Sequence, residues 1–562
     1  MKKWKIGALC AIVCVLVILL GSVVAFLAVD RGYGMEFTVS APQDRPHTLE
    51  VSLKLRSSLL SRDRQVVLYT GGKEITLRTV GGGEIREAED TLECVLGRGK
   101  EIQLVYDVTV GAEGKHGRRG AVTEDYCVFD GGQALLLPME FYADGFPEQE
   151  AVVSRLRVQM DPREGWTAVL PFEELTDLTW MDAYNINNNC FAMGRFVSCA
   201  LPGQDTGVRV YRVSGEENEL SGQTLEGIAA LDGYYQGKFS KQDRPYQAIL
   251  LPAGEGAVIG GAGAGSVCAT FDETSKRDWE LLSHRMFHAY FDTAFPTQRF
   301  HAAPQLWFYE GLATYYENQS VAALPESVRT VAGIQPETQF APLFNQYLYI
   351  KVKDPALFSF APMDEARISE SEGRKEFLHY IQAPLVVWLV ESLAGQEDAI
   401  LRELTAQRDR GEVFEMEPFL VRVLGNQAGG VYNNYFQSDA LLPLWKLKAP
   451  DRTEEQVLQD LNTVEQMLAS WMTQQLGQYP CDVLDLETVR RIQNRPEFQD
   501  AVFADAETET QIKAYSPAIW SLLKEYALWA QVCGVEFDEP MLRYHLLSDK
   551  ENLKKWKNWL EG

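Results

Sequence analysis

Residues 279–290 constrain this chain more than any other stretch, because they place two histidines on one face of an expected helix. Apolar residues recur there at helical spacing, and Ser275 with Asp278 resembles a capping box at the start of a helix. His284 and His288 are four positions apart, so their side chains lie one above the other. Two imidazoles in this arrangement can reach a single metal ion. The pattern therefore predicts an amphipathic helix with a candidate metal-binding pair.

The residue after the first histidine decides what chemistry such a helix can perform. In the HExxH motif of zinc proteases, the glutamate at this position is the general base. Here the position holds Arg285. Arginine stays protonated at any relevant pH, so it cannot take a proton from water. A unit charge roughly 5 Å from a divalent ion costs on the order of 6 kcal/mol at an effective dielectric of about 20. Zinc affinity should therefore fall unless Arg285 turns away or pairs with a carboxylate.

A second expected helix, over 305–318, carries Glu310. A catalytic zinc takes three protein ligands and leaves one position open for water. At this point the chain resembles the gluzincin metallopeptidases, and in particular the glycyl-aminopeptidase family, whose members read roughly LLSHExFHxW and then LWxxEGxTxYY. The matching stretches are 281–290 and 306–316. The resemblance implies a zinc site made of His284, His288 and Glu310.

Tyr380 lies just before an apolar run at 384–393, inside an expected helix over 375–394. The local sequence is similar to the Tyr-x-Lys-Gly element of the same family, with Gln382 in place of the lysine. The resemblance implies that Tyr380 donates a hydrogen bond to the tetrahedral oxyanion of peptide hydrolysis. A surface or core tyrosine is the alternative.

Both carboxylates that an aminopeptidase of this family needs are missing. One is the general base, replaced by Arg285. The other is a glutamate that grips the free amine of the substrate from a glycine-rich edge strand, and here residues 260–264 contain no carboxylate. The surrounding stretch, 254–265, also lacks the lysine and hydroxyl of a phosphate-binding loop, so we expect a glycine-rich edge or a loop rather than a nucleotide site.

These departures leave open whether the chain is an enzyme. The favoured hypothesis is a pseudopeptidase whose cleft binds a peptide or protein, with zinc optional. The alternative is an active zinc-dependent peptidase with a different general base, either Glu280 or Glu317. Both carboxylates are also potential partners for Arg285. Asp292 could hold the second nitrogen of His288, although a solvated charge at the helix end is the favoured interpretation.

The N-terminus predicts a membrane anchor. Lysines at positions 2, 3 and 5 precede an uncharged run over 6–29, which is long enough to span a bilayer, and Asp30 follows. The positive-inside rule then places the N-terminus in the cytoplasm and the bulk of the chain outside it. A cleaved signal peptide is the less favoured alternative.

Charge and cysteine usage exclude other classes of protein. A net charge of −26 argues against a nucleic-acid partner, because phosphates attract a cationic surface. The nine cysteines show no CxxC spacing, so the chain is not a disulfide-framework protein. Cys190 and Cys199 are close enough in sequence to pair, and buried free thiols are the alternative.

The expected fold class is an α+β multidomain protein. The expected parts are an anchor (1–29), a β-sandwich-like domain (30–240), a thermolysin-like gluzincin domain (241–450) and a helical C-terminal region (451–562). The β-rich part is indicated by period-two alternation, for example over 48–55. Two hairpins are expected to turn at 71–72 and 97–99.

Overall fold

The computed structural model describes residues 32–440 and 442, apart from a set of short gaps. The expected anchor at 1–29 and the expected helical region at 451–562 lie outside the described residues. The gaps are 58–63, 72, 115–116, 144–150, 204–206, 240–243, 254–256, 341, 344–345, 348–357, 359 and 441.

The chain forms two compact units, and neither is one continuous segment. The first comprises Met1–Gln298 and Ala323–Ile334, and the second comprises Arg299–Ala322 and Gln335–Gly562. The chain therefore leaves the first unit after Gln298, returns at Ala323 and leaves again after Ile334.

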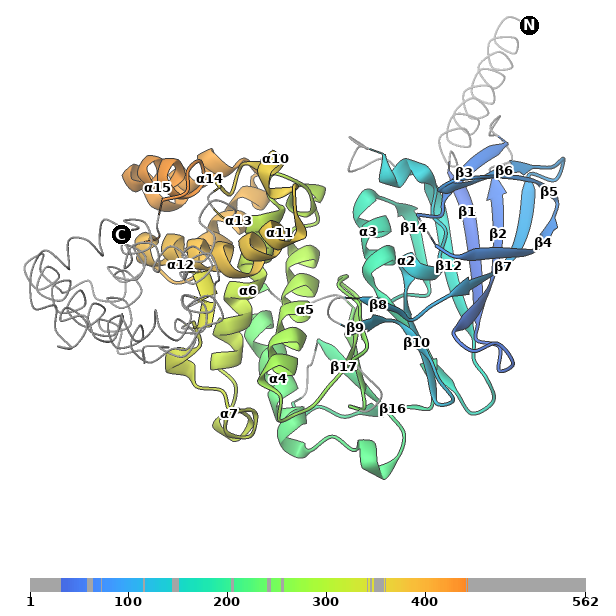
Figure 1. Cartoon of the computed structure of the whole chain (residues 1–562), viewed down its shortest axis with the longest axis horizontal. Coiled ribbons are helices and arrows are strands. Elements are labelled where there is room, and N and C mark those ends of the chain that lie inside the picture. Colours follow the sequence, from blue (N-terminus) through green and yellow to red (C-terminus); the bar gives the residue numbers. More distant parts are fainter. Residues whose placement is uncertain are drawn as a thin grey trace, which may run out of the picture. The chain divides into compact units, whose positions relative to one another are not determined.

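The first unit begins with a six-stranded sheet, coloured blue to teal in Figure 1. Alternation along β2 buries Leu49, Val51 and Leu53 completely and leaves the residues between them half-buried. β1 pairs antiparallel with β2 and parallel with β12. In sheet order the strands are β14 (Glu174–Leu178), β12 (Val153–Asp161), β1 (Tyr33–Ser40), β2 (Thr48–Ser57), β7 (Glu101–Thr109) and β4 (Ile75–Gly81).

A three-stranded sheet shares its apolar core with this sheet, and its buried side chains include Val66 and Leu68. The prediction of two hairpins that turn at 71–72 and 97–99 is wrong. β3 leads into β4, and β6 leads into β7, so each of these turns carries the chain from one sheet to the other. Such crossings are typical of two sheets packed face to face. The strands, in sheet order, are β3 (Gln65–Tyr69), β6 (Thr91–Leu96) and β5 (Gly83–Ala88).

Two further sheets position the candidate site. The five-stranded one holds three parallel neighbours, β17, β18 and β20, with helix α4 between β17 and β18. The expected domain boundary near residue 240 falls within this sheet. Its order is β16 (Phe196–Cys199), β17 (Val208–Val213), β18 (Tyr246–Leu251), β20 (Ser266–Thr270) and β19 (Ile259–Gly260). The four-stranded one runs β10 (Ala121–Val122), β11 (Tyr126–Asp130), β15 (Cys190–Gly194) and β13 (Thr167–Val169).

Among the helices of the first unit, only α5 is expected from the sequence. α4 packs against α5 through Gly227, where an added Cβ would lie 2.5 Å from the ring of Trp279. The helices are α2 (Gly131–Ala134), α3 (Trp180–Asn188), α4 (Gly222–Phe239), α5 (Lys276–Ala294) and α7 (Glu326–Ala332). A small two-stranded sheet is formed by β8 (Ala112–Gly114) and β9 (Gly117–Arg119).

The second unit is helical where it is described. Its central pair, α6 and α12, makes close contact at Gly311, where an added Cβ would lie 2.6 Å from the Cβ of Ala383. Buried Glu391 of α12 accepts the backbone N–H groups of Ala399 and Ile400 at the start of α13, both at 3.0 Å. The helices are α6 (Leu306–Ala322), α10 (Glu365–Ile368), α11 (Glu372–Phe377), the π-helix η5 (Leu378–Gln382), α12 (Ala383–Ala394), α13 (Ala399–Asp409), α14 (Met416–Leu424) and α15 (Ala428–Tyr435).

One helical stretch within the described residues, Glu372–Ala394, is long and apolar enough to cross a bilayer. Two-thirds of its most apolar window is buried inside the protein (67%). α12, which forms its second half, is apolar on nearly every side and contacts α6. These features are typical of the central helix of a globular core, which passes the same length and composition test.

Candidate metal centre

Helix α5 begins where the sequence predicts and carries the two histidines. The Ser275 side chain accepts the backbone N–H of Asp278, which caps the helix, while the Asp278 carboxylate accepts the backbone N–H of Asp272 at 2.8 Å. The expected capping box is therefore only half formed. His284 and His288 are 9% and 3% exposed, and their Nε2 atoms lie 2.9 Å apart. Both rings thus direct the same nitrogen toward one point.

Glu310 lies near the start of α6 and completes a group of potential metal ligands. Ligand atoms of His284, His288 and Glu310 all lie within 4.8 Å of one another. Two imidazole nitrogens and one carboxylate oxygen form the donor set of many catalytic zinc sites. Zinc–nitrogen bonds of about 2.0–2.1 Å at a tetrahedral angle would separate the two nitrogens by roughly 3.3 Å. The residues present therefore fit zinc with a small outward movement of the rings.

Arg285 follows the first histidine on α5 and has no counter-ion in direct contact. Within the described part of the chain, its guanidinium makes no hydrogen bond and no ion pair, and its Nε atom is buried. It nevertheless acts at longer range on two groups of the same unit, Asp130 and Tyr246. The hydroxyl of Tyr246 is likewise buried, with no hydrogen-bond partner among the described residues. Arg285 as a whole is half-buried, but a buried polar atom without a partner is costly and is one of the features that mark functional sites.

Asp130 is a carboxylate that the sequence analysis missed. It ends β11, and its Oδ1 accepts the backbone N–H of Gly261 at 2.7 Å. A Cβ on Gly260 would lie 2.7 Å from the same oxygen, so the glycine permits this approach. Burial raises the pKa of Asp130 to about 6, and the hydrogen bond from Gly261 and the charge of Arg285 partly offset that rise. Asp130 thus supplies a carboxylate beside the glycine-rich edge, where the family pattern led us to expect one from residues 260–264.

The described part of the glycine-rich stretch, 257–265, forms an edge strand and a loop held by asparagine side chains of the α3 region. The Oδ1 atoms of Asn185 and Asn189 accept the backbone N–H groups of Ala264 and Gly265, both at 2.8 Å. β19 then pairs antiparallel with β20 at the edge of the five-stranded sheet. This agrees with the expected glycine-rich edge.

The other candidate residues differ in their exposure and in their contacts. Asp292 is 2% exposed, so the favoured interpretation of it as a solvated charge is wrong. Glu280 forms an ion pair with Lys276 at 3.4 Å, one turn earlier on α5. Glu317 lies on α6 and is half-buried. Tyr380 lies in the π-helix η5, a type of turn found frequently at functional sites. Its role as oxyanion donor stays a prediction.

The cysteines described by the structure are free. Cys190 is buried and Cys199 is half-buried, and the two do not form the disulfide that their spacing allowed. Cys190 instead approaches Cys268 of β20, and burial together with that contact raises the pKa of the Cys190 thiol.

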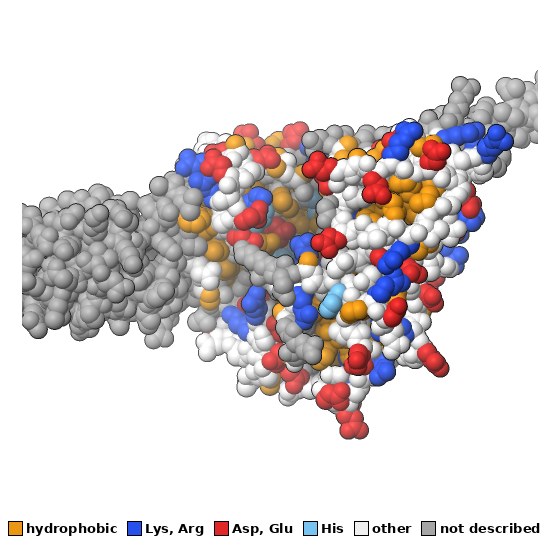
Figure 2. Space-filling model, turned by 45° about the vertical axis from the view of Figure 1, so that its right-hand side comes forward, with side chains coloured by type: hydrophobic (Ala, Val, Ile, Leu, Met, Phe, Trp, Pro, Cys, Tyr) orange, Lys and Arg blue, Asp and Glu red, His pale blue; other side chains and the backbone are white. Residues whose placement is uncertain are grey.

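The surface in Figure 2 shows acidic and basic side chains interspersed over the described part of the visible face. No extended cluster of blue side chains stands out among the residues drawn in colour on that face.

Comparisons with known proteins identify the fold. No protein-family model matches the sequence, and no curated protein matches it. Among solved structures, the chain is similar to an aminopeptidase N family protein from Idiomarina loihiensis, with a TM-score of 0.55 and 12% identity over 74% of this chain and 77% of that one. An M1 zinc metallopeptidase from Deinococcus radiodurans aligns with a TM-score of 0.45 and 15% identity over 73% of this chain and 94% of that one. The latter superposition is too weak to carry an argument.

At 12% identity, the likeness to the Idiomarina protein shows the fold alone. The chain is a mixed α and β multidomain protein, and the expected gluzincin aminopeptidase-like fold is confirmed to that extent. What the chain does with this fold depends on its own residues.

Proposed function

We propose that this chain is a membrane-anchored, extracytoplasmic pseudopeptidase of gluzincin fold that binds a peptide or protein without cleaving it. The observation that carries the proposal is Arg285, a guanidinium without a direct partner in the described residues, next to His284 in the position of the general base. The grouping of His284, His288 and Glu310 supports retention of the metal-binding geometry. In this proposal peptide hydrolysis is lost, because it needs a proton acceptor at residue 285, while binding of the peptide or protein ligand is retained.

In this proposal His284, His288 and Glu310 would hold zinc, which would supply Lewis-acid chemistry toward an oxygen atom of the ligand. Arg285 cannot take a proton from water, because its own proton is not released in proteins. It can instead donate hydrogen bonds, and five N–H groups in a planar fork match a carbonyl or carboxylate. The ligand favoured by this arrangement is therefore a peptide that presents oxygen atoms to the cleft.

The alternative general bases are poorly supported as proton acceptors. The Glu280 carboxylate already forms an ion pair with Lys276, one turn earlier on α5. Glu317 stays a prediction, since its half-buried position on α6 neither favours nor opposes the role.

The test compares two substitutions of Arg285 in the full chain. Arg285→Gln removes the cation without supplying a base, and Arg285→Glu does both. We expect zinc affinity, measured by competition with a chromogenic chelator, to rise at least tenfold in both variants, because a repulsive charge has been removed. We expect chelator-sensitive cleavage of mixed peptides in Arg285→Glu only.

Three results would contradict the proposal. Chelator-sensitive cleavage by the unmodified chain would favour the active peptidase, and Glu280→Gln and Glu317→Gln would then identify its base. Failure of all three proteins to bind zinc would remove the metal-site assignment. Unchanged zinc affinity in Arg285→Gln would show that the guanidinium does not oppose the metal.

A further inference from the structure

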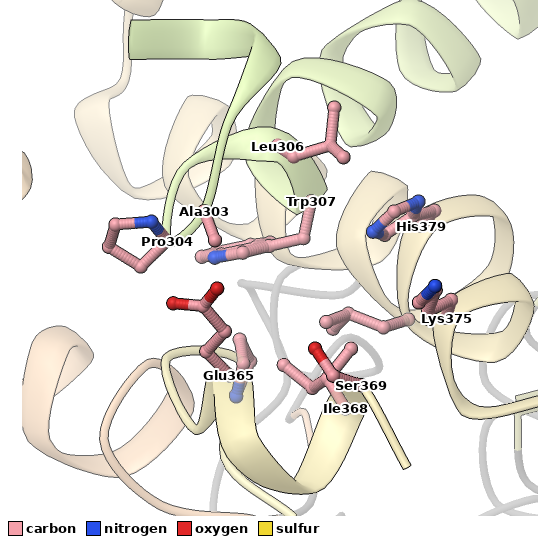
Figure 3. Close-up of a pocket in the computed structure, with 11 residues that line it drawn as sticks. Ala303, Pro304, Leu306, Trp307, Glu365, Ile368, Ser369, Lys375 and His379 are labelled. Carbon is pink, nitrogen blue, oxygen red and sulfur yellow. The ribbon is translucent and has the colours of Figure 1, made fainter. Parts of the chain in front are cut away.

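A pocket in the second unit lies at one end of α6 and encloses about 400 Å³, part of it open to solvent. Its walls are mainly apolar and come from the turn before α6, the start of α6, α10 with the residues beside it, α11 and η5. Figure 3 shows the side chains of Trp307, Glu365, Lys375 and His379 around this space. The apolar part of the wall includes Pro304, Leu306, Ile368 and Leu378.

The indole of Trp307 carries a donor that has no acceptor. Trp307 is 3% exposed, and its Nε1 is buried without a hydrogen-bond partner among the described residues. The ring is held by an edge contact with Phe436, with centroids 5.2 Å apart. A buried N–H left unpaired costs about 1–3 kcal/mol. Trp307 lines the pocket, so a small shift of the side chains around its ring would let an acceptor in the pocket reach this nitrogen.

Glu365 supplies an unused acceptor at the same end of the pocket. In Figure 3 its carboxylate is directed toward the side of the pocket where the nitrogen-bearing edge of Trp307 lies. Glu365 is exposed, and its carboxylate has no ion pair or hydrogen bond within the described residues. The pocket thus offers a neutral donor and an anionic acceptor to the same occupant.

The remaining polar groups of the pocket indicate which kinds of ligand it can bind. Lys375 is bound to Glu372 at 2.8 Å, so its charge is already compensated. Burial lowers the pKa of His379, which keeps its imidazole neutral near pH 7. A carboxylate ligand would meet the negative charge of Glu365 with no unpaired cation to offset it. An ammonium ligand could bind Glu365 but would leave the Trp307 N–H unpaired.

We propose that this pocket binds a primary carboxamide, the group carried by glutamine and asparagine side chains. Its carbonyl oxygen accepts from Trp307 Nε1, its NH₂ donates to the Glu365 carboxylate, and the methylene groups of its chain contact Leu306 and Ile368. A carboxamide meets both requirements with two adjacent atoms. If the proposed function holds, the occupant is a side chain of the bound peptide, since Trp307 precedes Glu310 by one turn of α6.

The experiment uses the full chain with its tryptophan indoles labelled with ¹⁵N, and butyramide as the probe. The Trp307 resonance is the one that disappears in Trp307→Phe. We expect butyramide to shift this resonance in a saturable way, and we expect butyrate, butylammonium and butanol to shift it at least tenfold less at equal concentration. Neither metal nor peptide is present, so this result does not depend on the tests of Arg285.

Two variants of matched exposure separate a binding role from a structural one. Glu365→Gln removes the charged acceptor, and we expect the half-saturating butyramide concentration to rise about tenfold, because charge-assisted hydrogen bonds are roughly twice as strong as neutral ones. Glu326→Gln is the control, since Glu326 is also an exposed acidic residue in the first turn of a short helix. It should leave that concentration unchanged.

The inference is overturned if the Trp307 resonance does not respond to butyramide, if a charged probe or the alcohol shifts it equally, or if Glu365→Gln binds butyramide as the unmodified chain does. If Trp307→Phe does not fold, the resonance is identified by its change in Glu365→Gln, because substitution of the exposed Glu365 leaves the core intact. A response that is equal in Glu365→Gln and Glu326→Gln would likewise assign no role to Glu365.

Discussion

At the scale of single residues, the sequence predicts the part of the site whose residues are close together along the chain. His284 and His288 are fixed relative to each other by one helical turn, so the pattern alone places them together. Asp130 is more than a hundred residues away from α5, and no spacing rule connects it to Arg285. Its only local signal is the glycine pair that follows it, and many loop residues share such a signal. Burial of Asp292 was missed for the same reason, because burial depends on long-range packing.

Asp130 should make stability depend on pH. The native pKa of about 6 lies above the ordinary value of 3.8, so the folded protein binds this proton more tightly than the unfolded chain. The resulting stabilisation is full below about pH 4 and is lost as the pH rises through about 6. Asp130→Asn keeps an acceptor for Gly261 and cannot ionise. We expect it to raise the free energy of unfolding at pH 7 by about 1–3 kcal/mol, and to change little at pH 4.

Urea denaturation at the two pH values measures this difference. Asp125→Asn is a suitable control, because the Asp125 side chain is 53% exposed and its ion pair with Arg195 is at the surface. An equal gain for Asp130→Asn at both pH values would mean that the charge of Asp130 is not what destabilises the protein.

At the scale of helices and strands, predictability follows the range of the forces involved. The helix expected over 305–318 is present as α6, because its 3.6-residue apolar period is visible locally. α4 was missed because it contains several glycines, which weaken the helical signal, although Gly227 is needed for contact with Trp279. The prediction of the two hairpins was wrong because turn residues do not indicate which sheet the next strand joins.

The close contact of α6 and α12 predicts the effect of filling it. In Gly311→Ala the new methyl group would lie 2.6 Å from Cβ and 2.9 Å from the carbonyl carbon of Ala383, so the helices must separate. We expect a loss of about 1–3 kcal/mol from overpacking, which exceeds the gain of about 1 kcal/mol in helix propensity. Gly373→Ala is the matched control, because no atom lies within 4 Å of its added Cβ.

Thermal unfolding of the full chain should therefore show a lower midpoint for Gly311→Ala and an unchanged or higher midpoint for Gly373→Ala. Equal midpoints for the two variants would show that α6 and α12 tolerate the extra volume, and that Gly311 is not required for their contact.

At the scale of the whole molecule, the N-terminal sequence predicts that the chain is anchored in a membrane. We expect the full chain to stay in the membrane pellet after alkaline carbonate extraction, because the run over 6–29 is long enough to span the hydrocarbon layer. A variant that starts at residue 32 should be released. Protease added outside the cell should degrade the unmodified chain. A released protein shortened by about 25–30 residues would instead support a cleaved signal peptide.

The path of the chain between the two compact units has a consequence for dissection. Because the first unit needs residues on both sides of 299–322, no single cleavage yields either unit as an uninterrupted fragment. A fragment ending at Gln298 would lack α7, and one starting at Arg299 would carry α7 away from its own unit. Neither unit can therefore be expressed or exchanged as one continuous segment. A shortened recombinant protein has to keep both units together, from β1 to α15.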